Sequence, residues 1–367
     1  MLKKLSLAAL IAMGSMSVAT ATPLTEAIKG VNLSGNIKVK FENNDNGKKE
    51  SKNKWATSGD FKFTVPVNEN LKVVYKIGAK HEIKTTDDKL KDKGNSGVKE
   101  KLAYLNYSVN GLDVVVGKIP VGTSVTDDDA GTGIIATYKV VDQLTVAAGW
   151  VDAIKTDTDI LGDDWTGNDI YTVGALFNID MVKGNIWYYQ ATNLLDSLYT
   201  LSVDVKPVDL VTLHADYAAG KVDIKGAETK TYFNISAEGS FEEVSVKAGY
   251  ASTNDKDGVV VLNDDAPISD VLPTKQNSSI ANSTDTTAIY IKGGYKIDSK
   301  ANVYVAYSTI DQGKDAGNED FTEIALGGSY KYTKKMKLSA YYSIKDGKNG
   351  AKDDDNNKFG FEAKYSF

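Results

Sequence analysis

The residues of this chain that could do chemistry are charged side chains at alternating positions. Lysines recur at alternate positions in three segments near the amino end: Lys38 and Lys40, then Lys62, then Lys72, Lys76 and Lys80. Alternate residues of a strand point to the same side, so these ammonium groups would form one basic wall. The simpler alternative is that they are only the water-facing half of each strand.

Carboxylates could supply the opposing charge. Asp127, Asp128 and Asp129 are consecutive in a stretch that also holds Pro120 and several glycines, and Asp152 comes later in the chain. Acids that face lysines across a narrow passage produce a transverse field, which favours ions and small polar solutes over apolar ones. We predict these four aspartates as an acidic side. The alternative is an ordinary surface loop with a solvated acidic run.

The same aspartates suggest a calcium ligand. Carboxylates together with carbonyl oxygens and water form the hard-oxygen environment that Ca²⁺ prefers. We predict Asp127 as the ligand, and the sequence indicates no required cofactor. Asn254–Gly258 superficially resembles a calcium loop, but it lacks the downstream Glu and the ligand spacing, so a turn is favoured.

The residue types argue against catalysis and against nucleic-acid binding. His81 and His214 are the two histidines, and neither lies in a recognisable motif, although Asp216 shares a face with His214. A polar wall explains that pair more simply than an active site. Cysteine and arginine are absent, and the formal net charge of −6 offers no basic field for a nucleic acid.

The amino end has the pattern of an export signal. Lys3 and Lys4 precede an uncharged stretch that ends at Val18, and Ala19-Thr20-Ala21 is typical of a cleavage site, so we predict a signal peptide over residues 1–21. Residues 22–30 follow with a Thr cap, a Pro at the first position and a closing Gly, which predicts one short helix.

Everything from residue 31 to residue 367 alternates in the manner of strands. In the last ten residues, Phe359, Phe361, Ala363, Tyr365 and Phe367 share one face. A strand of about ten residues tilted near 45° can cross a bilayer. Such segments recur about eighteen times, with sixteen as an alternative, which predicts an all-β transmembrane antiparallel barrel. A soluble β-sandwich also alternates, but its strands are usually shorter.

The connections alternate in length. Short turns such as Asn110-Gly111 and Asp298-Ser299 should face the periplasm. Longer polar stretches, which include Lys84–Ser96 and Thr253–Asp285, should be outward loops. Residues 118–133, after the fifth strand, combine Pro, glycines and acids and are predicted to fold back into the barrel as a constriction loop.

Several stretches resemble one known family. Thr22-Pro23-Leu24-Thr25-Glu26-Ala27-Ile28-Lys29-Gly30, Gly117-Lys118, Gly131-Thr132-Gly133 and Leu144-Thr145-Val146-Ala147-Ala148 are similar to the major outer membrane protein of Campylobacter and related epsilon-class bacteria, as is the aromatic carboxyl-terminal strand. The resemblance implies an eighteen-stranded trimeric porin with a constriction loop after the fifth strand, a moderate cation preference and a divalent cation near the narrowest point. Asp127 matches the acid before Gly-Thr-Gly. The family often has Arg where this chain has Lys38, Lys40 and Lys62.

Together these features predict a homotrimeric outer-membrane porin that lets ions and small hydrophilic solutes diffuse passively, with a weak cation preference. Outer-membrane lipid would be its other partner. One alternative is a substrate-specific channel, for which Tyr104, Trp187, Tyr189 and Tyr290 are candidate lining residues. A surface adhesin and an outer-membrane enzyme are the remaining alternatives.

Overall fold

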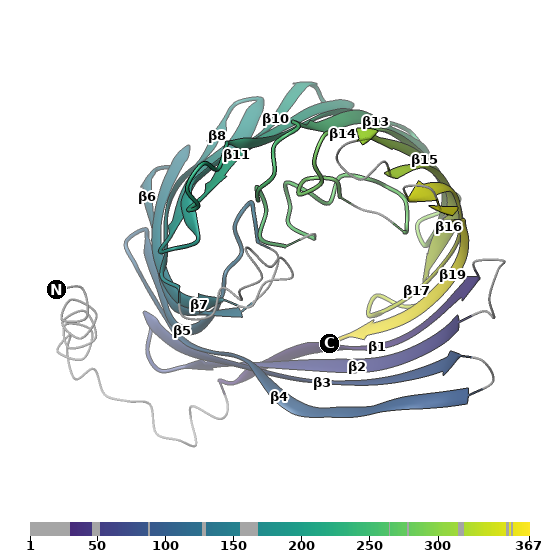
Figure 1. Ribbon diagram of the computed structural model, residues 1–367. Coiled ribbons are helices and arrows are strands. Elements are labelled where there is room, and N and C mark those ends of the chain that lie inside the picture. Colours follow the sequence, from purple (N-terminus) through teal and green to yellow (C-terminus); the bar gives the residue numbers. More distant parts are fainter. Residues whose placement is uncertain are drawn as a thin grey trace.

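The strands of this protein form a closed antiparallel ring (Figure 1). The computed structural model describes residues 30–45, 52–86, 89–126, 130–154, 168–263, 265–276, 279–314, 319–349, 352–353 and 355–367. Its strands are β1 (Asn32–Asp45), β2 (Lys52–Pro66), β3 (Leu71–Thr86), β4 (Lys89–Val109), β5 (Leu112–Pro120), β6 (Ala130–Val141), β7 (Leu144–Ile154), β8 (Ile170–Ile179), β9 (Val182–Ala191), β10 (Leu195–Val208), β11 (Val211–Val222), β12 (Lys230–Phe241), β13 (Val244–Thr253), β14 (Thr286–Lys296), β15 (Ala301–Gln312), β16 (Glu319–Lys331), β17 (Met336–Asn349), β18 (Lys352–Asp353) and β19 (Asn356–Ser366).

The ring closes through its last strand. β19 pairs with β17 on one side and with β1 on the other, while the two-residue β18 only pairs with the end of β17. At this seam the backbone N–H groups of Gly35 and Phe367 each donate to the other residue's carbonyl at 3.1 Å. Setting β18 aside, eighteen strands make the barrel, so the predicted all-β transmembrane barrel is confirmed.

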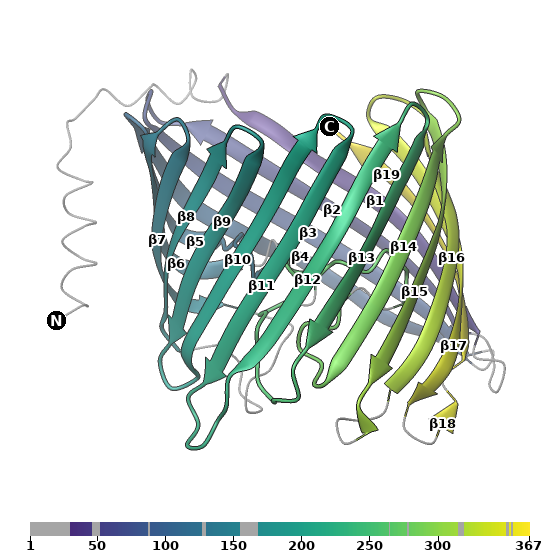
Figure 2. The same cartoon turned by 90° about the horizontal axis from the view of Figure 1, so that it is seen from above.

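Alternation along each strand separates an apolar outside from a polar inside. In β12, Phe233 and Ile235 are exposed, whereas Tyr232, Asn234 and Ser236 are buried. The strands run obliquely around the ring (Figure 2), which matches the tilt of membrane-spanning strands. Large apolar side chains therefore form an outer band that lipid can cover, and the polar set faces the lumen.

Two predicted elements, the signal peptide and the short helix that follows it, lie almost entirely outside the residues that the structure describes. Residues 1–29 lie outside the described residues, and with them the predicted signal peptide and all but the last residue of the predicted helix over 22–30. Within the described part of the chain, no helix is long and apolar enough to span a membrane.

The residue types in the short turns account for the backbone conformations and hydrogen bonds of these turns. Asn110 and Gly111 both have positive φ, 47° and 83°, which is the requirement of a two-residue type I′ hairpin turn. In the β14–β15 turn, the Asp298 carboxylate accepts hydrogen bonds from the N–H groups of Lys300 and Ala301, each at 2.7 Å. These hydrogen bonds hold the pKa of Asp298 below its ordinary value of 3.8.

One predicted loop is a continuation of strands. The polar stretch Lys84–Ser96 was expected to be a loop, yet β3 and β4 stay paired as far as Thr86 and Lys89. The strand pairing of this hairpin continues through the polar stretch. Apolar alternation is not needed there, so the composition of this stretch resembles that of a loop.

A second prediction was wrong in direction. Residues 254–285, between β13 and β14, were expected to project outward, but they fold into the ring (Figure 1). The segment contains the apolar run Val259-Val260-Val261-Leu262, whose residues are at most 7% exposed. Burial of that run against the barrel wall favours the inward position because it removes apolar surface from water.

The wall beneath this segment carries very small side chains. They come from five strands, are at most 1% exposed, and are called here the alanine lane: Ala218, Ala251, Ala288, Ala306 and Ala325. Methyl side chains let a chain segment lie close to the wall. Ala218, Ala251 and Ala288 belong to the same buried apolar cluster as Val259, Val260, Val261 and Leu262, so residues 254–285 partly fill the barrel interior over this part of the alanine lane.

Candidate pore constriction

The predicted basic wall lies on one side of the lumen. β1–β3 form part of the barrel wall opposite β10–β13 (Figure 1). Their outward-facing side chains include Ile37 and Tyr75, which are 47% and 40% exposed. The alternate positions therefore point inward, and these hold all the predicted lysines: Lys38, Lys40, Lys62, Lys72, Lys76 and Lys80.

Carboxylates that were not predicted lie among these lysines. Glu82, whose side chain is 14% exposed, forms ion pairs with Lys54, Lys80 and Lys84, and its carboxylate oxygens lie 3.3, 3.2 and 3.3 Å from their ammonium nitrogens. The basic wall is thus a network in which one acid bridges several lysines. Such a network fixes the positions of flexible lysine side chains.

Two further acids do the same. Asp60 contacts Lys76 at 3.7 Å and Lys101 at 2.7 Å. Glu42 contacts Lys40 at 3.0 Å and Lys358 at 3.4 Å. Each carboxylate neutralises only part of the positive charge around it, so the wall keeps an excess of ammonium groups.

The constriction loop folds inward, as far as the structure describes it. Ile119 and Val125 are fully buried. The Ser124 hydroxyl lies 2.7 Å from the Thr200 hydroxyl of β10 and 3.1 Å from the Tyr189 hydroxyl of β9. The flank before the acids is therefore fastened to the barrel wall from inside.

The predicted acidic side is only partly placed. Asp127, Asp128 and Asp129 lie outside the described residues. Asp152 is exposed and sits where the β6–β7 register shifts between Val151 and Ala153, on the outer parity that it shares with Ala148 and Trp150. Because alternation is interrupted at this shift, the strand pattern alone does not fix the direction of its side chain, and the place of Asp152 on the acidic side stays a prediction.

A second loop narrows the lumen, and its position is held by several strands. In residues 254–285, the Leu262 N–H donates to the Val125 carbonyl at 2.9 Å, which joins this segment to the constriction loop. Thr274 meets the Ser308 hydroxyl of β15 at 2.9 Å. The Gln276 amide donates to the Ser343 hydroxyl of β17 at 3.1 Å. The two inward loops are thus one connected body.

Glu323 on β16 is the strongest of these anchors. Its carboxylate is fully buried and accepts from the backbone N–H of Lys275 at 2.7 Å and from that of Gln276 at 3.1 Å. A buried carboxylate is stable only when its hydrogen bonds are satisfied. The loop therefore supplies the hydrogen bonds that make burial of the Glu323 carboxylate possible, and the carboxylate in turn holds the loop against β16.

Three of the four predicted lining aromatics are buried. Trp187, Tyr189 and Tyr290 are 8%, 2% and 1% exposed, because the inward loops and the wall cover them. Tyr104 lies on β4. Tyr304 and Tyr341 were not predicted; the centres of their rings lie 5.6 and 5.7 Å from the ammonium group of Lys275.

His214 lies between two acids on the opposite wall. Its Nδ1 is 2.7 Å from Asp204 and its Nε2 is 2.6 Å from Asp216. Each ring nitrogen of His214 therefore faces a carboxyl group. Asn234 donates to Asp216 at 2.9 Å and accepts from the Tyr290 hydroxyl at 2.7 Å.

The described residues give calcium no ligand set. They contain no group of three or more His, Asp or Glu arranged for a metal ion, and Asp127 lies outside them. The Asn254–Gly258 stretch is a turn, as favoured, in which Asn254 accepts from the Thr231 N–H at 3.0 Å.

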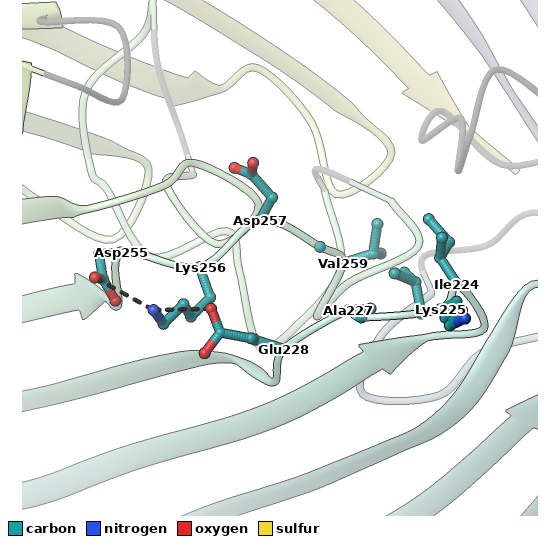
Figure 3. Close-up of a pocket in the computed structure, with 11 residues that line it drawn as sticks. Ile224, Lys225, Ala227, Glu228, Asp255, Lys256, Asp257 and Val259 are labelled. Carbon is teal, nitrogen blue, oxygen red and sulfur yellow. Dashed lines mark ion pairs between the residues drawn. The ribbon is translucent and has the colours of Figure 1, made fainter.

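A depression of about 570 Å³ lies beside that turn, at the end of the barrel with the long connections (Figure 3). Lys256 lies 2.9 Å from Glu228 and 3.6 Å from Asp255, and these acids hold its pKa above the ordinary value. The charges of this depression are therefore largely paired with one another.

Solved structures with the same architecture are known. Acinetobacter baumannii OccAB4 matches with a TM-score of 0.73 and 11% identity over 96% of this chain and all of its own. Pseudomonas aeruginosa OccK5 (OpdH) has a TM-score of 0.70 and 12% identity over 92% of this chain and 98% of its own. P. aeruginosa OpdK, solved with vanillate, has a TM-score of 0.71 and 12% identity over 92% and 99%. At such identities the likeness concerns the fold alone.

Family membership comes from the sequence. No match was found among the curated proteins compared. The model of the Campylobacter major outer membrane protein family matches residues 1–365, nearly the whole chain. This match agrees with the closed barrel, the inward loop after β5 and the charged lumen. The chain belongs to the Campylobacter major outer membrane protein family and is an outer-membrane porin.

Proposed function

We propose that this porin is a general-diffusion channel through which ions and small hydrophilic solutes pass down their gradients, with a weak preference for cations. The observation that carries the proposal is the pair of inward loops fastened to each other and to the wall, beside a lysine-rich surface. An eighteen-stranded barrel encloses more space than its own side chains fill, and loops of this kind narrow it without closing the ring.

Charge is distributed unevenly around the lumen. The β1–β3 wall carries an excess of lysines, while the opposite wall carries Asp204, Asp216 and Glu238 at inward positions. We propose that Asp127, Asp128 and Asp129 add to the acidic side and decide the cation preference. Opposed charges orient dipolar solutes and disfavour apolar ones.

The proposal is tested in planar bilayers with a KCl gradient. Purified protein should conduct, and its reversal potential should favour K⁺. Replacing Asp127, Asp128 and Asp129 together with Asn should shift that potential toward chloride, because three carboxylates leave the constriction. An unchanged potential would remove these residues from the selectivity mechanism.

A matched control removes three acids from the short-turn end, as Asp142→Asn, Asp180→Asn and Asp209→Asn. These charges lie away from the loops, so the reversal potential should stay close to that of the unmodified protein.

We also propose a homotrimer, for which conductance should appear in steps of three and unheated gels should show a trimer band.

Calcium at Asp127 is a separate proposal that rests on the sequence alone. Single-channel current should differ between Ca²⁺ and EGTA in the unmodified protein, and the difference should vanish in Asp127→Asn.

We further propose that the barrel catalyses no reaction: His214, bonded at both ring nitrogens, has no free nitrogen to act as a base.

A further inference from the structure

Two tyrosine rings lie flat on the lumen wall because glycines face them. A Cβ on Gly327 would lie 2.5 Å from the Tyr304 hydroxyl, and a Cβ on Gly360 would overlap the Tyr341 ring. The rings therefore occupy the space that side chains on the neighbouring strands β16 and β19 would take. Each ring turns one face to its glycine and leaves the other toward the lumen.

Ammonium groups gather over these rings. Lys292 lies 4.7 Å and Lys275 lies 5.6 Å from the centre of the Tyr304 ring. Lys275 is also 5.7 Å from the centre of Tyr341. Lysines from a wall strand and from the inward loop thus converge on one aromatic surface, here called the lysine–tyrosine patch: Lys275, Lys292, Tyr304 and Tyr341.

Two of the nearby acids, Glu323 and Glu42, already have partners. The Glu323 carboxylate accepts from two backbone N–H groups. Glu42 lies between Lys40 and Lys358 and accepts a hydrogen bond from the Tyr341 hydroxyl at 3.3 Å. Neither acid has an ion pair with Lys275 or Lys292 in the described part of the chain.

The surroundings of Lys275 disfavour its charge. Burial, followed by repulsion from Lys292, lowers the pKa of Lys275, and Asp270 and Glu323 offset this only in part. A bound anion would relieve both effects, since it adds an opposite charge and fills the donors of two ammonium groups. A further cation would be repelled.

We propose that the lysine–tyrosine patch is an anion-binding station inside the channel, and that it holds small organic acids by their carboxylate. Lys275 and Lys292 contact the carboxylate, while the lumen-side faces of Tyr304 and Tyr341 pack against the carbon part of the solute. The inference rests on the proposed channel and adds to it one class of solute that the channel retains in passing.

The test uses benzoate as probe and acetate as its smaller counterpart, in planar bilayers at constant ionic strength. Benzoate should reduce the single-channel current in a saturable way at lower concentration than acetate. Lys275→Gln with Lys292→Gln should weaken the benzoate effect about tenfold or more, which is the loss of roughly 1.4 kcal/mol or more. Lys256→Gln, in the same loop but at the mouth, should leave it unchanged.

Two more variants separate the parts of the site. Tyr304→Leu should weaken benzoate and leave acetate nearly unaffected, because it removes a ring face and keeps both ammonium groups. Lys275→Arg, combined with Lys292→Gln, should bind benzoate more tightly than the double Gln variant does, because it keeps a positive charge at position 275.

The outcomes are distinct. If the protein conducts and benzoate has no saturable effect, or if the Lys275 and Lys292 variant responds like the unmodified protein, the anion station is wrong while the channel stands. If folded protein does not conduct, the channel proposal fails. Titration calorimetry of benzoate into the refolded barrel then decides the station alone: absence of saturable binding would overturn it.

Discussion

A single buried carboxylate fastens the loop that narrows this pore. Glu323 is fully buried and accepts hydrogen bonds from two backbone N–H groups of residues 254–285. Glu323→Gln removes the charge from these bonds, and bonds to charged groups contribute about 1.5–3 kcal/mol each. The loop should loosen, which should raise mean conductance and current noise and speed trypsin cleavage after Lys275.

Glu238→Gln provides the comparison for that experiment. Glu238 also points into the lumen but is exposed. It should change ion selectivity slightly and leave current noise and cleavage rate as they are. Equal noise in the Glu323 variant and the unmodified protein would contradict the anchoring role of Glu323.

Asp298 gives the β14–β15 turn a dependence on pH. Its folded-state pKa is lowered by the N–H groups of Lys300 and Ala301, so its contribution is present above the ordinary value of 3.8 and is lost as the pH falls below it. Hydrogen exchange of these two amides should therefore be less protected at about pH 2.5 than at about pH 5. In Asp298→Asn the protection should not depend on pH in this way.

At the scale of elements, the inward loop can be fixed covalently. The chain has no cysteine, and the hydroxyls of Thr274 and Ser308 are 2.9 Å apart. Thr274→Cys with Ser308→Cys should form a disulfide on oxidation, because side chains whose hydroxyls are 2.9 Å apart already point at each other. Current noise should fall and mean conductance should stay similar, as the loop is already seated.

The single variant Thr274→Cys supplies the baseline without a crosslink. A pair that stays reduced under oxidising conditions, shown by thiol labelling, would contradict the position of the loop.

Alternation predicted the elements well and their contents less well. The strands, including the last one, and the inward loop after β5 follow from period-two patterns and from a cluster of Pro and Gly. The second inward loop was missed, although its run Val259–Leu262 is too apolar for an outward loop. Composition was averaged over a long polar segment, and that average hid the run.

The site residues show why register is needed. Asp152 was predicted on the acidic side, and it sits at a shift in the β6–β7 pairing, which a single strand does not reveal and which interrupts the alternation used for the prediction. Tyr304 and Tyr341 were missed because aromatic residues suit both the lipid girdle and the lumen. Their pairing with Gly327 and Gly360 could have served as a signal once neighbouring strands were aligned.

At the scale of the whole molecule, the ring and its contents are separable. β13 and β14 are hydrogen-bonded along their length, so a cut in residues 254–285 leaves both strands in place. A protein carrying a protease site after Lys256 should, once cut, keep the fast unheated gel mobility of a folded barrel and conduct more. Separation of the two fragments without heating would contradict this prediction.

The alanine lane also bears on how the protein is assembled. Among the described residues of 254–285, none takes part in a strand pairing of the barrel, so the ring can close in the membrane while the loop is still outside it. The alanine lane and Glu323 both belong to the barrel strands, so the surface to which the loop binds is already formed before the loop docks. Insertion into the bilayer and setting of the pore width are thereby two successive events, and a defect in the second leaves an inserted barrel that is too permeable.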